Sequence, residues 1–442
     1  MTIKLSDHFT VRRLLKFTLP SIAMMIFTSI YGVVDGFFVS NYAGQVEFTA
    51  VNFIMPFLMM LGAIGFMFGT GGSALVAKTM GEGDCEKAQR IFSMVIYLSV
   101  GLGIVISALG IAFLRPLAAW LGAEGELLEN CVTYGRIILL ANPAFILQME
   151  FQSFFITAEK PQLGLIVTVA AGVANMVLDF VLVGLLPWGI EGAAAATALS
   201  QVVGGLVPMF YFARRNGSCL RFTRFSFDGK ALLKTCTNGS SELMSNISMS
   251  LVGLLYNVQL LAYAGENGVA AYGVMMYVNF VFISVFIGYS IGTAPIVSYH
   301  FGAQNHGELR GLLRKSLMLI IAAAVGMLVL SLALAKPLSA LFVGYDAVLL
   351  DMTVSGFRIF ALSFLFSGFA IYFSGFFTAL NDGLTSAVIS FLRTLVFQIA
   401  AVLLLPLLWD LDGIWISVVV AEAMAVLTGL VFLIGKQKKY HY

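Results

Sequence analysis

The sequence has 442 residues, of which 60% are hydrophobic and 11% are Asp, Glu, Lys or Arg, and its mean hydropathy is +0.94. Charges this sparse cannot coat a soluble globule of this size, so the composition excludes an ordinary soluble enzyme or nucleic-acid-binding protein and predicts an integral membrane protein. The formal net charge of +2 excludes nothing further.

Apolar stretches of about 20 residues recur along the whole chain, and each is long enough to cross a bilayer as an α-helix. We count twelve, which predicts an all-α integral membrane protein with twelve transmembrane helices in a lipid bilayer. The predicted spans are residues 14–39, 49–76, 91–114, 128–156, 162–186, 190–213, 236–263, 269–299, 316–335, 347–378, 384–408 and 413–435.

The two halves of the sequence repeat one another with a shift of about 221 residues, as when Arg136-Ile137 recurs as Arg358-Ile359. Because each half contains an even number of spans, both halves enter the membrane in the same sense and form a parallel repeat. We therefore expect two six-helix lobes, residues 1–213 and 236–442, around a central cleft.

Lysine and arginine residues gather on one side of the predicted membrane. Twenty of the 25 lie at the N-terminus, in the C-terminal tail or in loops of the same side, which include the basic linker 214–235 between the lobes. Cytoplasmic loops collect positive charge, so both termini are predicted to be cytoplasmic.

Two carboxylates lie inside apolar spans, where a charged side chain costs about 2.5–3.5 kcal/mol on insertion scales and usually serves a function. Asp35 lies on the first span one helical turn from Tyr31, and Asp179 lies on the fifth span one turn from Asn175. The sixth span returns through small residues that permit close packing and adds the hydroxyl of Thr197. Packed together, these residues predict a cation site in the N-terminal lobe.

Carboxylate, amide and hydroxyl oxygens suit a small cation, while two acids that share a dry site also allow proton binding. The coupling ion is therefore predicted to be H⁺ or Na⁺, with Asp35, Asn175, Asp179 and Thr197 as metal ligands only if it is Na⁺. The alternative is that these side chains only hydrogen-bond between helices. The matching positions of the second half carry no acids, so the ion chemistry is predicted to be confined to the first lobe.

Two further features suit a transporter of organic molecules. Pro20 lies on the first span below Tyr31, where the missing backbone donor is expected to kink the helix and act as a hinge. The 20 methionines, with Phe and Tyr, could line a cleft that accepts varied flat cations, although Met and Phe are equally ordinary lipid-facing residues. Glu242, near the cytoplasmic end of the seventh span, either attracts a cationic solute or extends toward the interface. The candidate cleft residues are Met24, Met25, Glu242, Met275 and Met276.

The remaining motifs exclude other chemistry. Cys85, Cys131, Cys219 and Cys236 show neither close spacing nor a neighbouring His cluster, so we expect isolated thiols rather than a zinc site or a disulfide framework. The sequence contains no Gly-x-x-x-x-Gly-Lys-[Ser/Thr] loop, so ATP is not expected to drive the process directly. No catalytic residue and no cofactor are expected, and the chain is not predicted to be an enzyme.

Taken together, these residues resemble the multidrug and toxic compound extrusion (MATE) family, and within it a bacterial branch of exporters. The resemblance covers essentially the whole chain. Its most specific parts are the Tyr31 to Asp35 segment, the spacing of Asn175, Asp179 and Thr197, the loops at Gly81 and Gly302, and the run Tyr263-Ala-Gly-Glu-Asn-Gly-Val-Ala-Ala-Tyr-Gly-Val.

In relatives with this pattern, the matching aspartates, asparagine and threonine form a cation site in the N-terminal lobe, and in some members a proline matching Pro20 is where the first helix bends on protonation. The resemblance implies an antiporter of the bacterial cytoplasmic membrane that exports small organic cations by alternating access, in exchange for inward H⁺ or Na⁺. We expect a monomer with no nucleic-acid partner.

Two other functions are compatible with twelve spans. A flippase for a lipid-linked precursor would need a strongly cationic cleft for pyrophosphate, whereas this sequence offers mainly acids there. An uncoupled channel would conduct its solute without concentrating it, and the tandem repeat argues against a channel.

Overall fold

The computed structural model describes residues 3–442, apart from the side chains of residues 40, 41 and 45, and it contains no strand in that range. The predicted first lobe begins two residues earlier, outside the described residues. The helices are α1 (Val11–Phe38), α2 (Gln45–Gly81), α3 (Cys85–Trp120), α4 (Gly125–Thr157), α5 (Pro161–Asp179), α6 (Gly189–Ala213), α7 (Gly229–Gly302), α8 (His306–Val343), α9 (Ala347–Ala361), α10 (Phe364–Ala379), α11 (Gly383–Phe391), α12 (Phe397–Leu404) and α13 (Pro406–Tyr440), with π-helical turns η1 (Val39–Ala43), η2 (Phe180–Leu185) and η3 (Leu392–Val396).

The number of membrane spans depends on how α7 is counted. Over residues 3–442, ten helices are long and apolar enough to cross a membrane, and α9 with α10 forms an eleventh span that bends by 48°. Helix α7 has 74 residues, far more than the roughly 20 that cross a bilayer. Its backbone leaves the helical conformation at Gly265, where φ is 63°, a value that glycine adopts readily. Counted as two spans, α7 brings the total to the twelve predicted.

Polar side chains cap the N-termini of helices α3 and α8. Both caps lie outside the predicted apolar spans. The side chain of Asp84 accepts a hydrogen bond from the backbone N–H of Lys87 at the start of α3, and Asn305 accepts one from Glu308 at the start of α8. Such caps satisfy backbone donors that have no partner inside the helix. The two residues occupy matching positions of the repeat, so both lobes use the same local device.

The structure corrects two predicted boundaries. The span predicted at 347–378 is not one helix, because the chain bends between α9 and α10. The predicted linker 214–235 is helical from Gly229 onward, where the side chain of Asp228 caps α7 by accepting from the N–H groups of Lys230 and Ala231.

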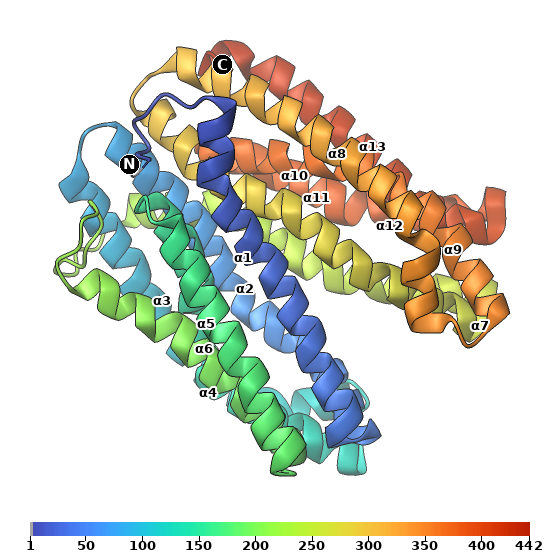
Figure 1. Ribbon diagram of the computed structural model, residues 1–442. Helices are drawn as coiled ribbons and strands as arrows, with labels where there is room; N and C mark the ends of the chain where they lie inside the picture. The colour runs from blue at the N-terminus through green and yellow to red at the C-terminus, as the bar shows by residue number, and fades with distance from the viewer. Residues whose placement is uncertain (1–2) are drawn as a thin grey trace.

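The helices form two lobes, α1–α6 and α7–α13, that meet where both termini lie and diverge toward the opposite end (Figure 1). We call the first of these the termini end. Helix α7 packs closely against α2 here: a Cβ added at Gly239 would overlap the carbonyl oxygen of Met67, and one at Gly302 would overlap that of Lys78. The two lobes therefore touch backbone to backbone at the termini end.

The segment before α1 contacts both lobes. The backbone N–H of Leu5 donates to Glu159 Oε1 of the N-terminal lobe at 2.7 Å, while that of Phe9 donates to Glu308 Oε1 of the C-terminal lobe at 2.9 Å. At the other end of the chain, the hydroxyl of the buried Tyr442 donates to the carbonyl of Leu433 at 2.8 Å. Leu5, Phe9 and Tyr442 are thus part of the packed structure.

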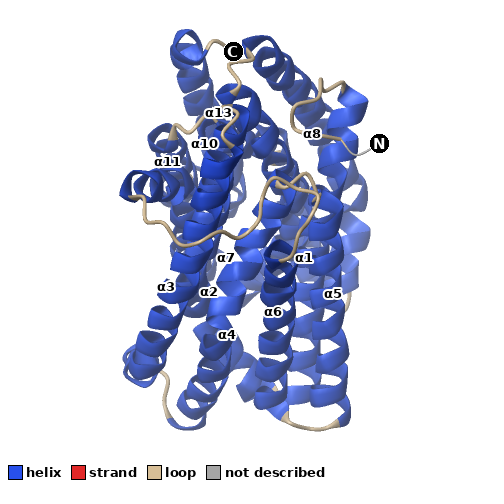
Figure 2. Cartoon of the chain, turned by 90° about the vertical axis from the view of Figure 1, so that its left-hand side faces the viewer, coloured by secondary structure: helices blue, strands red, loops and turns tan. Residues whose placement is uncertain are grey.

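The interlobe linker crosses the outside of the N-terminal lobe as an extended loop (Figure 2). Phe222 stacks on Phe92 of α3 with ring centroids 5.3 Å apart, and the N–H of Thr223 donates to Ser93 Oγ at 2.9 Å. These contacts fix the linker along α3 instead of leaving it between the lobes.

Candidate functional site

The predicted ion-binding side chains come together between α1, α5 and α6. Thr197 donates from Oγ1 to Asp35 Oδ1 at 3.4 Å. The carboxyl of Asp35 also lies close to the side chains of Asn175 and Asp179. Small residues allow this approach: a Cβ added at Gly172 of α5 would collide with the rings of Phe27 and Tyr31 on α1, which places α1 directly against α5.

The two α5 residues of this group are enclosed. Asp179 is 0% exposed and Asn175 is 1% exposed. Within residues 3–442, neither oxygen of the Asp179 carboxyl nor either polar atom of the Asn175 amide has a hydrogen-bond partner. Leaving such groups buried and unsatisfied costs about 1–3 kcal/mol each. A bound proton or small cation coordinated by these oxygens would offset that cost.

Both acids lie next to irregular helix. The π-helical turn η2 begins directly after Asp179, and η1 begins four residues after Asp35. Single π-helical turns are rare and occur often at functional sites. They change which side chains face the neighbouring helices at the level of the two carboxyls.

One member of the site was missed by sequence reasoning. Tyr134 of α4 is 1% exposed, and its side chain lies close to Thr197 and to the charges of Asp35 and Asp179. A tyrosine in an apolar span is common, so nothing in the sequence distinguished it. Its position was accessible only through the packing of α4 on α6.

The candidate cleft residues differ in how exposed their side chains are. Met24 and Met275 are buried at 1% and 0% exposure, and Met275 belongs to the apolar core of the C-terminal lobe. Met275 therefore does not line a cleft in this conformation. Met25 and Met276 are partly exposed, as is Glu242.

The C-terminal lobe holds an ion pair in place of an acid pair. Arg393 of η3 donates to both oxygens of Glu422 on α13, with N–O distances of 2.9–3.1 Å. The arginine also lies near the charge of Glu242 on α7. Tyr256, the expected counterpart of Asp35, donates its hydroxyl proton to Gln398 at 2.8 Å.

The comparison with protein families identifies this architecture. The MatE family model matches the chain twice, over residues 20–181 and 243–404, which is once in each lobe. The chain belongs to the MATE family.

Relatives of this MATE protein match along nearly the full length. The multidrug export protein MepA of Staphylococcus aureus (strain MRSA252) is 23% identical over 423 residues, covering 96% of this chain and 93% of the relative. MepA of Staphylococcus saprophyticus is 24% identical over 421 residues, covering 95% and 92%. A solved structure described as the outward-facing conformation of a multidrug resistance MATE family transporter superposes with a TM-score of 0.93 at 22% identity, covering 98% and 97%.

The hinge predicted at Pro20 lies inside α1 of this MATE protein, and the helix continues through it from Val11 to Phe38. Pro20 is buried near the level where α1 meets the second half of α7, since a Cβ added at Gly288 would contact Ile22. A bend at this proline would therefore change the contact between the lobes.

The structure corrects the prediction that all four cysteines are isolated. Cys85 and Cys219 form a disulfide with Cα atoms 6.1 Å apart, although they are separated by 134 residues, while Cys131 and Cys236 are free. The fold of the linker along α3 brings the two together, which cysteine spacing could not reveal.

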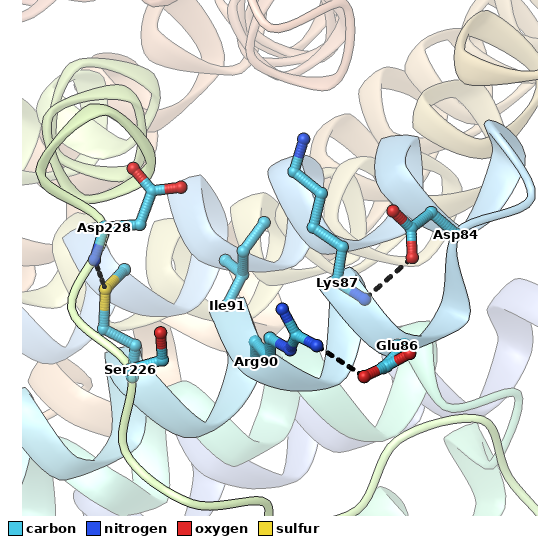
Figure 3. A pocket seen from close by; sticks show the side chains of 8 residues that line it. Asp84, Glu86, Lys87, Arg90, Ile91, Ser226 and Asp228 are labelled. Atoms are coloured by element: carbon cyan, nitrogen blue, oxygen red, sulfur yellow. Dashed lines mark hydrogen bonds and ion pairs between the residues drawn. The ribbon is translucent and has the colours of Figure 1, made fainter.

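Beside the disulfide, the linker and the start of α3 enclose a hollow of about 300 Å³. Figure 3 shows Lys87 and Arg90 on α3 across from Ser226 and Asp228 of the linker. Arg90 is paired with Glu86 at 2.5 Å. The hollow mixes both signs of charge and is built from other residues than the ion site.

Proposed function

We propose that this MATE protein is an antiporter that exports small organic cations from bacterial cells by alternating access, driven by inward movement of H⁺ or Na⁺. The observation that carries the proposal is the carboxyl of Asp35 close to the fully buried Asp179, together with the unpaired polar atoms of Asp179 and Asn175. The relatives' description as multidrug export proteins agrees with it.

The ion acts by binding one conformation more tightly than the other. An ion shifts a two-state equilibrium only through a difference in affinity. The site bridges α1 to α5 and α6, and α1 also packs against α7 of the other lobe. Occupancy of the site is thereby linked to the contact between the lobes. Ion binding lowers the population of the conformation that binds the substrate.

The electrical part of the driving force is adequate for concentration of a solute. One elementary charge crossing about 100 mV contributes roughly 2.3 kcal/mol, which corresponds to accumulation of about 50-fold. A concentration gradient of the ion adds to this value.

The orientation predicted from Lys and Arg places the termini end in the cytoplasm. In that orientation the lobes are packed together on the cytoplasmic side and diverge toward the outside, which corresponds to an outward-facing state. The protein is expected to reside in the bacterial cytoplasmic membrane as a monomer.

The flippase alternative finds no support in the charges of the C-terminal lobe. Recognition of pyrophosphate needs unpaired cations, but Arg393 is neutralised by Glu422, and Glu242 adds a further negative group. These charges favour a cationic solute.

The test is uptake of a fluorescent organic cation into inverted vesicles under an imposed H⁺ or Na⁺ gradient. We expect accumulation in the parent and at least a tenfold loss in Asp179→Asn, which keeps the shape of the side chain and removes its charge. Asp351→Asn, at an exposed position of α9, is the matched control and should transport normally.

The ion whose gradient drives accumulation is the coupling ion. Full transport by Asp179→Asn would remove this residue from the mechanism. Absence of transport in the parent under both gradients would contradict the antiporter.

A further inference from the structure

A second group of buried polar side chains lies in the N-terminal lobe, closer to the termini end than the ion site. Gln148 and Gln152 are one turn apart on α4, and Thr168 lies on α5. Their exposed fractions are 5%, 6% and 3%. Together with Gly204 and Pro208 of α6 they line a narrow hollow of about 10 Å³ between the three helices.

Several amide atoms in this part of the lobe are unsatisfied. Within residues 3–442, Gln148 Oε1, Gln152 Nε2 and Gln201 Oε1 are buried without a hydrogen-bond partner. Each costs about 1–3 kcal/mol if it stays unpaired. Polar groups that served only to join helices would bond to one another, so these atoms are available to a ligand as small as a water molecule or a bare cation.

The group is continuous with the ion site. The side chain of Tyr31, one turn from Asp35, lies close to that of Gln148. On α5, Thr168 is 11 residues from Asp179 toward the termini end, which is about 16 Å along a helix. The polar side chains therefore extend the ion site through the lobe interior toward the side predicted to be cytoplasmic.

We propose that the coupling cation leaves for the cytoplasm through the interior of the N-terminal lobe, along a transient site formed by Gln148, Gln152 and Thr168. This inference rests on the proposed function. The alternative exit is the central cleft once the lobes open to the inside.

The chemistry of the site suits passage better than storage. Neutral amide and hydroxyl oxygens coordinate a Na⁺ that has shed its water, or hold a single water molecule that conducts a proton, without the strong attraction of a carboxylate. Gly204 provides the space, because a Cβ there would overlap the Gln148 side chain. Beyond the hollow, Lys160, Arg214 and Arg215 surround a surface depression, and their charge lowers the local cation concentration and opposes rebinding.

The experiment separates ion release from the change of conformation in vesicles containing the purified full-length protein. One measurement is the rate of gradient-driven antiport of a fluorescent organic cation. The other is exchange of labelled for unlabelled organic cation without an ion gradient, which requires the lobes to alternate but no net ion passage. The variants are Gln152→Leu and Thr168→Val, which remove polarity with little change of size.

We expect either variant to slow gradient-driven antiport at least tenfold while substrate exchange stays within twofold of the parent. The matched control is Thr428→Val on α13 of the other lobe, where the hydroxyl bonds, among residues 3–442, only to the Met424 carbonyl of its own helix, and it should reduce neither rate more than twofold. If one variant fails to fold, exchange is lost with it, and the other variant decides.

Two results would overturn the route: unchanged antiport in both variants, or equal loss of antiport and exchange in both. A parent that exchanges substrate but shows no gradient-driven antiport would instead overturn the proposed function, and the route with it. The parent measurement thus distinguishes the two failures.

Discussion

The close approach of the lobes at Gly239 makes the conformational equilibrium sensitive to a single methyl group. In Gly239→Ala, the new Cβ would overlap the carbonyl oxygen of Met67. Rotation of a side chain cannot relieve this overlap, because the obstructing atom is backbone. The variant should therefore separate the lobes at the termini end and favour the state that is open there.

The size of the effect follows from the cost of overpacking. Inserting a methyl group into a packed contact costs about 1–3 kcal/mol, which changes the ratio of the two states by about 5- to 150-fold. Replacing glycine by alanine inside a helix also stabilises that helix by about 0.5–1 kcal/mol. Gly253→Ala is the matched control, since it lies on α7 with no atom within 4 Å of an added Cβ.

A native thiol reports the separation. Cys236 lies three residues before Gly239 and packs against apolar side chains of the N-terminal lobe. In a Cys131→Ser background with the disulfide intact, we expect a maleimide to label Cys236 at least five times faster in Gly239→Ala than in Gly253→Ala. Equal labelling rates in two folded variants would refute the argument that the contact at Met67 holds the lobes together.

Two predictions concern stability in detergent. Burial alone would raise the pKa of Asp382, but hydrogen bonds from Lys436 at 2.6 Å and Tyr440 at 2.8 Å outweigh it and hold that pKa below its ordinary value. The ionised carboxyl therefore stabilises the fold fully above about pH 5, and this stabilisation disappears as the pH falls through the lowered pKa of the folded state. The difference in melting temperature between the parent and Asp382→Asn should narrow only in acid. A difference that narrows already near pH 7 would contradict this prediction. Glu422→Gln leaves the charge of Arg393 buried without its ion-pair partner and should lower the free energy of unfolding by about 3–5 kcal/mol. The double variant Arg393→Met with Glu422→Leu should recover most of this loss. A loss below about 1 kcal/mol in Glu422→Gln would show that the pair is solvated.

The architecture could be predicted from the sequence because the lipid bilayer imposes a simple requirement on each transmembrane segment. Every span must be apolar and about 20 residues long, so the spans and their parallel repeat were readable, and the MatE match in each half agrees with them. The carboxyls at Asp35 and Asp179 stood out because an acid is costly in that solvent. Their proximity then followed from the packing of α1 against α5.

The errors lie where the sequence carried no such contrast. An apolar helix in a membrane has no polar face, so nothing indicated that Met275 points into the core of its lobe. Tyr134 resembles any other aromatic residue of a span. The pairing of Cys85 with Cys219 depends on the path of a loop across α3, which their spacing does not predict. The bend between α9 and α10 falls at Leu362 and Ser363, so no proline or glycine predicted it.

The contacts made by Leu5, Phe9 and Tyr442 limit where the protein can be labelled. Leu5 and Phe9 donate to Glu159 and Glu308 in different lobes, and Tyr442 is buried, so an affinity tag inserted next to these residues competes with native contacts and biases the population of conformations. Tyr345, in the turn between α8 and α9, is 84% exposed. That turn offers an attachment point for a fluorophore or an epitope that leaves the contacts of Leu5, Phe9 and Tyr442 in place.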